Sequence, residues 1–284
     1  MNAVEIITLI LKISIFLTAL GYGLKTTAED AFYLFRNPGL LLRSILAMNI
    51  IMPVVAILMA LLFNLPPLVK VALLAISVSP LAPLFPKKTS KAGGRQGYAL
   101  GLMLVASMFC ILLIPVTLEI LARIFKVPVE VNSKALIITA LVSVIIPLIS
   151  GIAAQHFAPA FADKISNPVS RIALILLIVS ALPVLVKMFP AIVHLAGNGT
   201  ALAIAGFVIL GVCVGHFLGN TAEKDDRSVL ALATASRHPA IAISVASANM
   251  PDHHLVPAAI LLYLLINAIV TLPYLKWLQK NKPE

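Results

Sequence analysis

Charged residues are scarce in this chain, and acidic residues are the scarcest. Only 11% of the 284 residues are charged, with 21 Lys and Arg against 11 Asp and Glu, whereas soluble domains are about a quarter charged. Hydrophobic residues make up 61% and the mean hydropathy is +1.05, more apolar surface than a soluble fold of this length can bury. Much of the surface must face lipid, which restricts spanning segments to helices because an open sheet would leave backbone groups unpaired.

Cysteines and metal-ligand patterns are also nearly missing. Cys110 and Cys213 are the two cysteines, and both stand in apolar stretches. We expect them to be small buried hydrophobes and not a disulfide. The sequence contains no metal-ligand cluster and no nucleophile–base pair at the depth of the bilayer midplane. We therefore expect neither an enzyme nor a bound metal or cofactor, with sodium doubtful.

The net charge of +10 would suit a nucleic-acid partner, but its distribution does not. Lys and Arg stand mostly in short connections between apolar runs, which is the pattern of a membrane protein and not of a nucleic-acid-binding face. The expected partners are the lipid bilayer and a small organic anion, and the protein can also form a homo-oligomer.

Nine apolar segments have the length of about twenty residues that a bilayer span requires. The first is too long for a signal peptide core and lacks a basic leader. The sequence predicts an all-α polytopic membrane protein with one domain over residues 1–284. The segments cover approximately 4–24, 39–63, 68 to a point between 86 and 93, 98–121, 135–155, 169–188, 201–219, 228–249 and 255–275.

Basic residues near the span ends predict the orientation. With the N-terminus outside, most of them face the cytoplasm, so we expect an integral protein of the cell inner or plasma membrane with a cytoplasmic C-terminus. The inner set is Lys25, Arg36, Arg43, Arg95, Lys164, Arg171, Lys224, Arg227, Lys276, Lys280 and Lys282, and the outer set is mainly Lys70, Arg123, Lys126, Lys134 and Lys187.

The third segment is interrupted by prolines. Pro80, Pro83 and Pro86 remove backbone donors and clash with a continuing helix, and Lys87, Lys88, Thr89 and Ser90 follow. Unwound backbone at this depth is tolerated only against protein or a water-filled cavity. Alternatively, the span ends at Pro86 and the lysines simply flank it in the cytoplasm.

The eighth segment repeats this pattern at Arg237, His238 and Pro239. Arg237 stands near the centre of the bilayer, where a charge costs at least about 2–3 kcal/mol unless water or a partner receives it. Two interrupted helices at corresponding positions indicate a transporter site. A structural ion pair or a capping role is the alternative for Arg237.

The seventh segment carries Gly211, Gly215 and Gly219 at a spacing of four residues. This spacing permits close helix approach, so we interpret the glycines as packing residues. We expect His216 beside them to be a hydrogen-bonded bundle residue and not a proton relay.

Several of these stretches resemble the bile acid:sodium symporter family. The similar residues are 21–24 with 32–38, then Ser79-Pro80 through Arg95-Gln96-Gly97-Tyr98-Ala99-Leu100, and 231–242, in an order and spacing that cover nearly the whole chain. The resemblance implies an inverted repeat, here residues 1–126 and 127–284, with core and panel domains and two broken helices that cross in the core. Nine spans match members that lack one helix of the first repeat.

The sequence departs from the family where sodium-coupled members bind two sodium ions. There the resemblance implies a Ser-Asn pair in the first broken helix and Glu and Gln in the second. Lys87 and Lys88 align with the pair, Ala233 with the Glu and Arg237 with the Gln. Because Lys and Arg offer no acceptor and repel sodium, we hypothesise that fixed protein charges take the role of the ions.

These observations predict a secondary transporter of a small organic anion, a carboxylate, working by alternating access without the usual sodium sites. One alternative is a sodium-coupled organic anion or bile acid symporter with displaced ligands, and another is a non-transporting membrane sensor or assembly partner. His238 leaves proton coupling open. The candidate substrate-binding residues are Arg237, His238, Lys87, Lys88, Thr89, Ser90, Thr234, Ser236 and Ser244.

Overall fold

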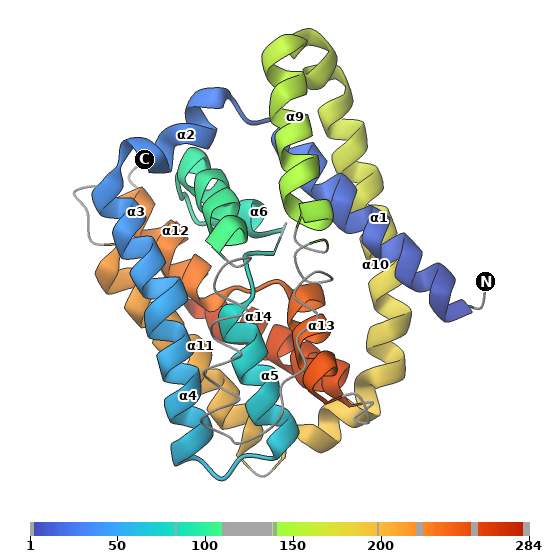
Figure 1. Cartoon of the computed structure of the whole chain (residues 1–284), viewed down its shortest axis with the longest axis vertical. Helices are drawn as coiled ribbons and strands as arrows, with labels where there is room; N and C mark the ends of the chain where they lie inside the picture. The colour runs from blue at the N-terminus through green and yellow to red at the C-terminus, as the bar shows by residue number, and fades with distance from the viewer. Residues whose placement is uncertain are drawn as a thin grey trace.

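The computed structural model describes residues 3–82, 84–109, 138, 141–197, 199–219, 224–250 and 255–280, and every regular element in them is helical (Figure 1). The first half comprises α1 (Ala3–Gly23), α2 (Ala28–Arg36), α3 (Pro38–Ile45), the π-helix η1 (Leu46–Ile51), α4 (Met52–Leu62), α5 (Pro67–Val78), α6 (Phe85–Lys91) and a helix over Gln96–Phe109. The second half comprises the π-helix η2 (Leu141–Ile145), α9 (Ile146–Phe157), α10 (Pro159–Leu195), α11 (Thr200–Leu218), α12 (Lys224–Ala235), α13 (Pro239–Asn249) and α14 (Val256–Lys280).

The predicted all-α polytopic architecture is confirmed. Each of the nine apolar segments is mainly helical over its described part, with breaks between Val78 and Phe85 in the third and between Ala235 and Pro239 in the eighth. Residues 110–121 of the fourth and most of 135–140 of the fifth lie outside the described residues. Six helices are long and apolar enough to cross a membrane: Glu5–Gly23, Pro38–Leu62, Pro159–Leu195, Thr200–Leu218, Asp225–Ser247 and Val256–Lys280. Pro67–Val78, Gln96–Phe109 and Leu141–Phe157 are shorter apolar helices.

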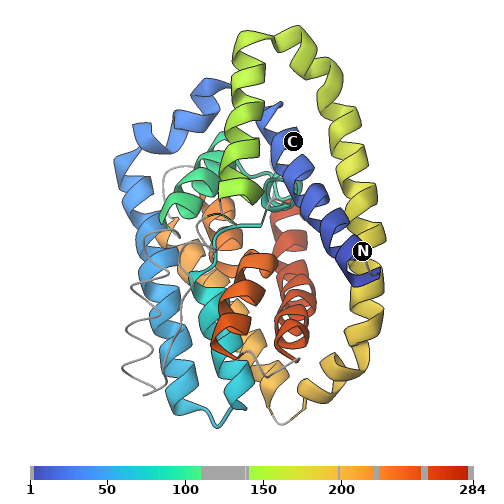
Figure 2. The ribbon, with the colours of Figure 1, turned by 45° about the vertical axis from the view of Figure 1, so that its right-hand side comes forward.

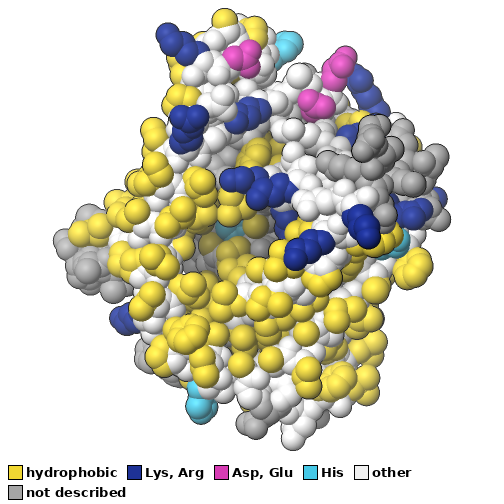
Figure 3. Space-filling model, turned by 180° about the vertical axis from the view of Figure 1, so that it is seen from behind, with side chains coloured by type: hydrophobic (Ala, Val, Ile, Leu, Met, Phe, Trp, Pro, Cys, Tyr) yellow, Lys and Arg dark blue, Asp and Glu magenta, His cyan; other side chains and the backbone are white. Residues whose placement is uncertain are grey.

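The outer surface is apolar over most of its height. Only 11% of the most apolar stretch of α10 is buried, and large side chains such as Val186 (66% exposed) and Phe189 (56% exposed) point outward. Figure 3 shows hydrophobic side chains covering the lower half of one face, with Lys and Arg gathered above them. A continuous apolar surface of this kind requires lipid as its solvent.

The helices pack in two groups. α1, η2, α9 and α10 contact one another and form what we call the panel group; the remaining elements apart from α2 form the core group, around α5, α11, α12, α13 and α14. Figure 2 shows α1, α9 and α10 together along one side of the molecule. Within the panel group α1 and α9 approach so closely at Gly23 and Gly151 that a Cβ on either glycine would overlap the backbone of the other helix.

α2 is fastened to the core group through Asp226 at the start of α12. Tyr33 donates a hydrogen bond to Oδ2 of Asp226 at 2.9 Å, and Nε of Arg95 lies 3.4 Å from Oδ1 of the same carboxylate. The Arg95 guanidinium also stands 4.8 Å above the centre of the Tyr33 ring, a favourable cation–π contact. Burial, followed by the nearby Asp226 carboxylate, raises the pKa of Tyr33 to about 12.

Two short connections join the panel group to its neighbours in the described chain. Residues 24–27 link α1 to α2, where Thr27 caps the new helix by accepting a hydrogen bond from the backbone N–H of Asp30 at 3.2 Å. Residues 196–199 link α10 to α11, with Gly199 in the left-handed region at φ 79°. Glycine adopts that conformation without steric cost.

The three glycines and His216 of α11 make the contacts expected for the seventh segment. Gly211, Gly215 and Gly219 face α12, and a Cβ on Gly215 would overlap Thr234 and the backbone of Leu230, so the packing interpretation is confirmed. His216 Nδ1 forms a 2.8 Å hydrogen bond with the Tyr274 hydroxyl, as expected of a bundle residue.

Cys213 corrects one expectation, because it is exposed on α11 and not buried. It stands on an outward face of this apolar helix, so an apolar stretch in the sequence did not distinguish a core position from a lipid-facing one. Cys110 lies outside the described residues.

Candidate functional site: a helix crossing and an adjoining cavity

The third and eighth segments are both interrupted, and their unwound stretches touch. α5 ends at Val78 and α6 begins at Phe85, while α12 ends at Ala235 and α13 begins at Pro239. The backbone N–H of His238 donates to the carbonyl of Pro80 at 2.8 Å. The two broken helices therefore meet backbone to backbone inside the core group. Pro83 lies outside the described residues.

Prolines explain why three backbone carbonyls near this crossing lack the N–H donor that a regular helix would supply. A carbonyl in an α-helix accepts from the N–H four residues later, but the residue four after Ala235 is Pro239, and the residue four after Ser79 is also a proline. Met48 lies in η1, where the N–H of Met52 is taken by Ala47 and the next residue is again proline. These three carbonyls need donors from elsewhere.

Arg237 supplies two of those donors. Its guanidinium donates to the carbonyl of Met48 at 2.9 Å and to that of Ser79 at 3.3 Å, and the residue is only 3% exposed. Ser79 is the C-cap of α5, where partial negative charge collects at the helix end. Arg237 thus places a fixed cation against the C-terminal end of the first broken helix.

Lys88 makes the corresponding arrangement in the other direction. Its ammonium donates to Oδ1 of Asn267 at 3.0 Å and to Oγ of Ser236 at 3.3 Å. Asn267 and Tyr263, both on α14, donate in turn to the carbonyl of Ala235, the last residue of α12. Lys88 therefore brings a cation from the first broken helix to the C-terminal end of the second.

Among the remaining predicted residues at the crossing, the hydroxyl side chains bond to nearby backbone carbonyls. Thr234 is buried and lies within hydrogen-bond distance of the carbonyls of Gly211, Leu230 and Ala231. Thr89 is buried and donates to the carbonyl of Pro86 at 3.0 Å, and Ser244 donates to that of Ala240 at 3.0 Å. His238 is 1% exposed, and within the described residues neither ring nitrogen has a hydrogen-bond partner.

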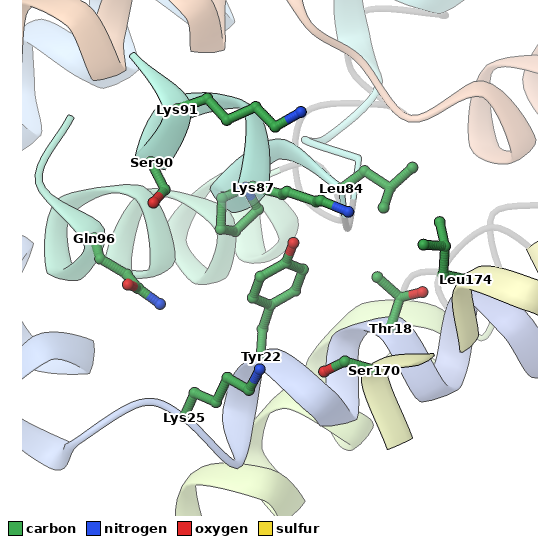
Figure 4. A pocket seen from close by; sticks show the side chains of 11 residues that line it. Thr18, Tyr22, Lys25, Leu84, Lys87, Ser90, Lys91, Gln96, Ser170 and Leu174 are labelled. Carbon is green, nitrogen blue, oxygen red and sulfur yellow. The ribbon is translucent and has the colours of Figure 1, made fainter. Parts of the chain in front are cut away.

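A cavity of about 380 Å³ opens beside α6, between the panel group and the core group (Figure 4). On the panel side, three residues of α1 and its C-terminal turn and two of α10 line it. On the core side, α6, the residue before it and Gln96 complete the wall. The lining residues are Thr18, Tyr22, Lys25, Leu84, Pro86, Lys87, Ser90, Lys91, Gln96, Ser170 and Leu174.

The two walls are bridged near the middle of the cavity. Figure 4 shows the Tyr22 hydroxyl pointing from α1 toward Lys87 of α6, and the backbone N–H of Lys87 donates to that hydroxyl. Lys87 and Lys91 extend in the same general direction from α6, and Lys25 lies beneath Tyr22 on the opposite wall. In the described part of the chain, the cavity lining contains cations and neutral polar groups but no carboxylate.

Of the predicted site residues that the structure describes, Lys87, Ser90 and Pro86 line the cavity and the others lie outside its lining. Arg237, Lys88 and Ser236 are together at the crossing instead. Direct contact of Arg237 with substrate stays a prediction, since its described partners are backbone carbonyls.

The panel side of the cavity was missed in the sequence, although a signal was present. Thr18, Tyr22 and Lys25 follow one another at spacings of four and three residues at the C-terminal end of the first apolar segment, and Ser166 and Ser170 are four residues apart on α10. Such spacing places polar side chains on one helical face. A polar stripe along a spanning helix predicts a face turned toward protein or water.

Comparison with known proteins supports a transporter. A family model described as the Sodium Bile acid symporter family matches residues 12–195, more than half of the chain. A protein of Bacillus subtilis (strain 168) named Uncharacterized sodium-dependent transporter YocS is 25% identical over 266 residues, covering 89% of this chain and 77% of that protein. The resemblance found in the sequence is thus confirmed, and so is the prediction of a transporter and not an enzyme.

Proposed function

This chain belongs to the Sodium Bile acid symporter family, and on that premise we propose that it carries a small organic anion across the membrane with fixed protein cations in place of sodium ions. The expected substrate is a carboxylate. The core group and the panel group move against each other, and the cavity between them is exposed to one side of the membrane at a time.

The charge of the cavity supports an anionic substrate. Lys25, Lys87 and Lys91 line it together with hydroxyl groups and the Gln96 amide. Ammonium groups bind carboxylates through charge-assisted hydrogen bonds, which are roughly twice as strong as neutral ones. A cation would be repelled by the same wall.

The crossing supports the substitution of sodium by protein charges, and this is the observation that carries the proposal. In transporters with broken helices, unwound carbonyls and helix C-termini coordinate the coupling cation. Here Arg237 occupies the carbonyls of Ser79 and Met48, and Lys88 occupies Ser236 and Asn267. Each broken helix thus receives a basic side chain from the other.

The alternative of sodium symport with displaced ligands follows from the name of the Bacillus relative. It would use Thr234, Ser236 and backbone carbonyls as oxygen donors to the ion. Those oxygens already have partners: Thr234 bonds to α11 and α12 carbonyls, Ser236 accepts from Lys88, and the carbonyl of Ala235 accepts from Tyr263 and Asn267. Their engagement favours the substitution.

Uptake into proteoliposomes tests the proposal. The purified protein is reconstituted, and the uptake of labelled organic anions is followed with an inward gradient of sodium or of choline at equal ionic strength. We expect equal initial rates in the two salts and no uptake in protein-free vesicles. Strong sodium dependence would refute the substitution while leaving anion transport intact. Absence of flux for every anion, and of thermal stabilisation by any of them, would favour a non-transporting sensor or assembly partner.

We further propose that the cavity faces the cytoplasm in this conformation, with the N-terminus outside and the C-terminus inside. The cavity lies beside α6 and the C-terminal end of α1, in the upper half of the molecule in Figure 1. Figure 3, seen from behind, shows most Lys and Arg in that upper half, as the positive-inside rule requires of the cytoplasmic side. A cysteine placed at the exposed Lys280 should react with an impermeant thiol reagent only in inverted vesicles, and labelling from outside intact cells would reverse the assignment.

A further inference from the structure

The cavity carries more positive charge than a simple carboxylate can balance. Three ammonium groups, those of Lys25, Lys87 and Lys91, stand on its wall. In the ranges that the structure describes, none of the three forms an ion pair, and the partner of Lys25 is the neutral Oδ1 of Asn167 at 2.8 Å. All three lysines are exposed, so water and salt screen them in part, but an anion with one charge still balances fewer of them than a dianion does.

The lysines are also divided between the two walls. Lys25 follows α1 in the panel group, whereas Lys87 and Lys91 are one helical turn apart on α6 in the core group. Figure 4 shows the Tyr22 hydroxyl between Lys25 and Lys87. A single carboxylate would share one negative charge between the two walls, whereas a dianion can offer one charge to each wall.

We infer that the cavity takes a small dianion, either a dicarboxylate or a phosphate monoester, held between Lys25 on one wall and Lys87 and Lys91 on the other. This inference rests on the proposed function and adds the charge of its substrate. Lysine suits both chemistries because its ammonium acts as a compact point charge for carboxylate and for phosphate. The cavity of about 380 Å³ has room for a molecule of a few carbon atoms.

Occupancy by a dianion would also connect the moving parts. An anion bound by lysines of both groups draws α1 and α6 together, and the empty cavity leaves like charges facing each other across the gap. The unfavourable repulsion in the empty state is therefore relieved only when both walls are engaged. A monoanion relieves it in part.

Binding of shape-matched anions tests the inference. The full-length protein in lipid nanodiscs is titrated with succinate and its monomethyl ester, and separately with methyl phosphate and methyl sulfate, at pH 7.5 and about 50 mM ionic strength, where charge screening is weak. We expect at least one dianion to bind about tenfold or more tightly than its singly charged partner. The two pairs distinguish a dicarboxylate from a phosphate ester.

Variants locate the effect. Lys87→Gln and Lys91→Gln should each weaken dianion binding about tenfold and monoanion binding much less, because each removes one charge from one wall. Lys276→Gln, an exposed position on α14, removes the same charge outside the cavity lining and should leave the preference unchanged. Thermal melting of each variant confirms that it is folded.

The outcomes separate this inference from the proposed function. Equal or tighter binding of the monoanions, with transport intact, overturns the dianion and leaves an organic-anion carrier. A dianion preference that survives both α6 variants also overturns it, because the charge would then be recognised elsewhere. If neither charge class binds or is transported, the inference and the proposed function fail together.

Discussion

On the function that we propose, replacing Lys88 by asparagine should introduce a response to sodium that the native protein lacks. Lys88 holds Oγ of Ser236 and Oδ1 of Asn267 at 3.3 and 3.0 Å. The substitution removes the ammonium, frees both oxygens and adds an amide oxygen on a shorter side chain. The vacated position beside the C-terminal end of α12 then offers a sodium ion the oxygen ligands that a hard cation requires.

The magnitude follows from the contacts. Two hydrogen bonds from a charged donor contribute about 3–6 kcal/mol, and most of this is offset because the buried charge no longer has to be desolvated. We expect a net loss of about 1–2 kcal/mol in choline salts. A sodium site with a dissociation constant of about 5 mM would return about 2 kcal/mol at 150 mM sodium.

The assay is thermal melting and proteoliposome uptake in sodium and in choline. The Lys88→Asn variant should melt several degrees higher in sodium and should recover part of its uptake there, whereas the native protein and the exposed control Lys276→Asn should respond to neither salt. A folded Lys88→Asn variant that ignores sodium would refute the idea that the ammonium stands at a cation position. So would a native protein that is stabilised by sodium to the same extent.

Three further substitutions test the packing and the fixed charges. Gly215→Ala should lower the free energy of unfolding by about 1–3 kcal/mol, because the added Cβ overlaps α12. The control Gly206→Ala lies on the same helix, where a Cβ meets nothing within 4 Å, and should be neutral or slightly stabilising. Equal effects of the two substitutions would contradict the close approach of α11 and α12. Arg237→Gln should abolish uptake and cost about 3–6 kcal/mol of stability, because it takes charged hydrogen bonds from two buried carbonyls. Unchanged uptake and melting would exclude both roles. Tyr33→Phe should cost about 1 kcal/mol at pH 8. Since the folded pKa of Tyr33 is raised from 10.0 to about 12, its contribution to stability is complete below pH 10 and falls as the pH rises to 12, a decline that should be missing from the melting curves of the variant.

The sequence predicted where the chain crosses the membrane and where it breaks, because both depend on local chemistry. Length and apolarity locate the spans, and Pro80 and Pro239 stop a helix whatever surrounds them. Counting residues predicted a deep position for Arg237, and the structure shows the residue buried. Its partners did not, because the carbonyls of Met48 and Ser79 are 189 and 158 residues away and are freed by prolines in other elements.

Neighbouring lysines show the limit of a one-dimensional pattern most clearly. The sequence alone suggests one shared role for the adjacent Lys87 and Lys88, but consecutive side chains of a helix point about 100° apart. Lys87 and Lys91 therefore face the cavity, while Lys88 reaches Ser236 and Asn267 inside the crossing. The alternative that both lysines merely flank the span does not describe this arrangement. Which lysine faces which way depends on the rotation of α6, and tertiary packing sets that rotation.

The attachment of α2 bears on which backbone segments would accommodate the proposed motion of the panel group against the core group. Because the Asp226 carboxylate fastens α2 to the core group through Tyr33 and Arg95, we expect α2 to move together with the core group. In the motion that we propose, a displacement of α1 would fall on the backbone torsions of residues 24–27, and a displacement of α10 on those near Gly199. Stiffening either link, and not only altering the cavity, should slow the turnover of the carrier.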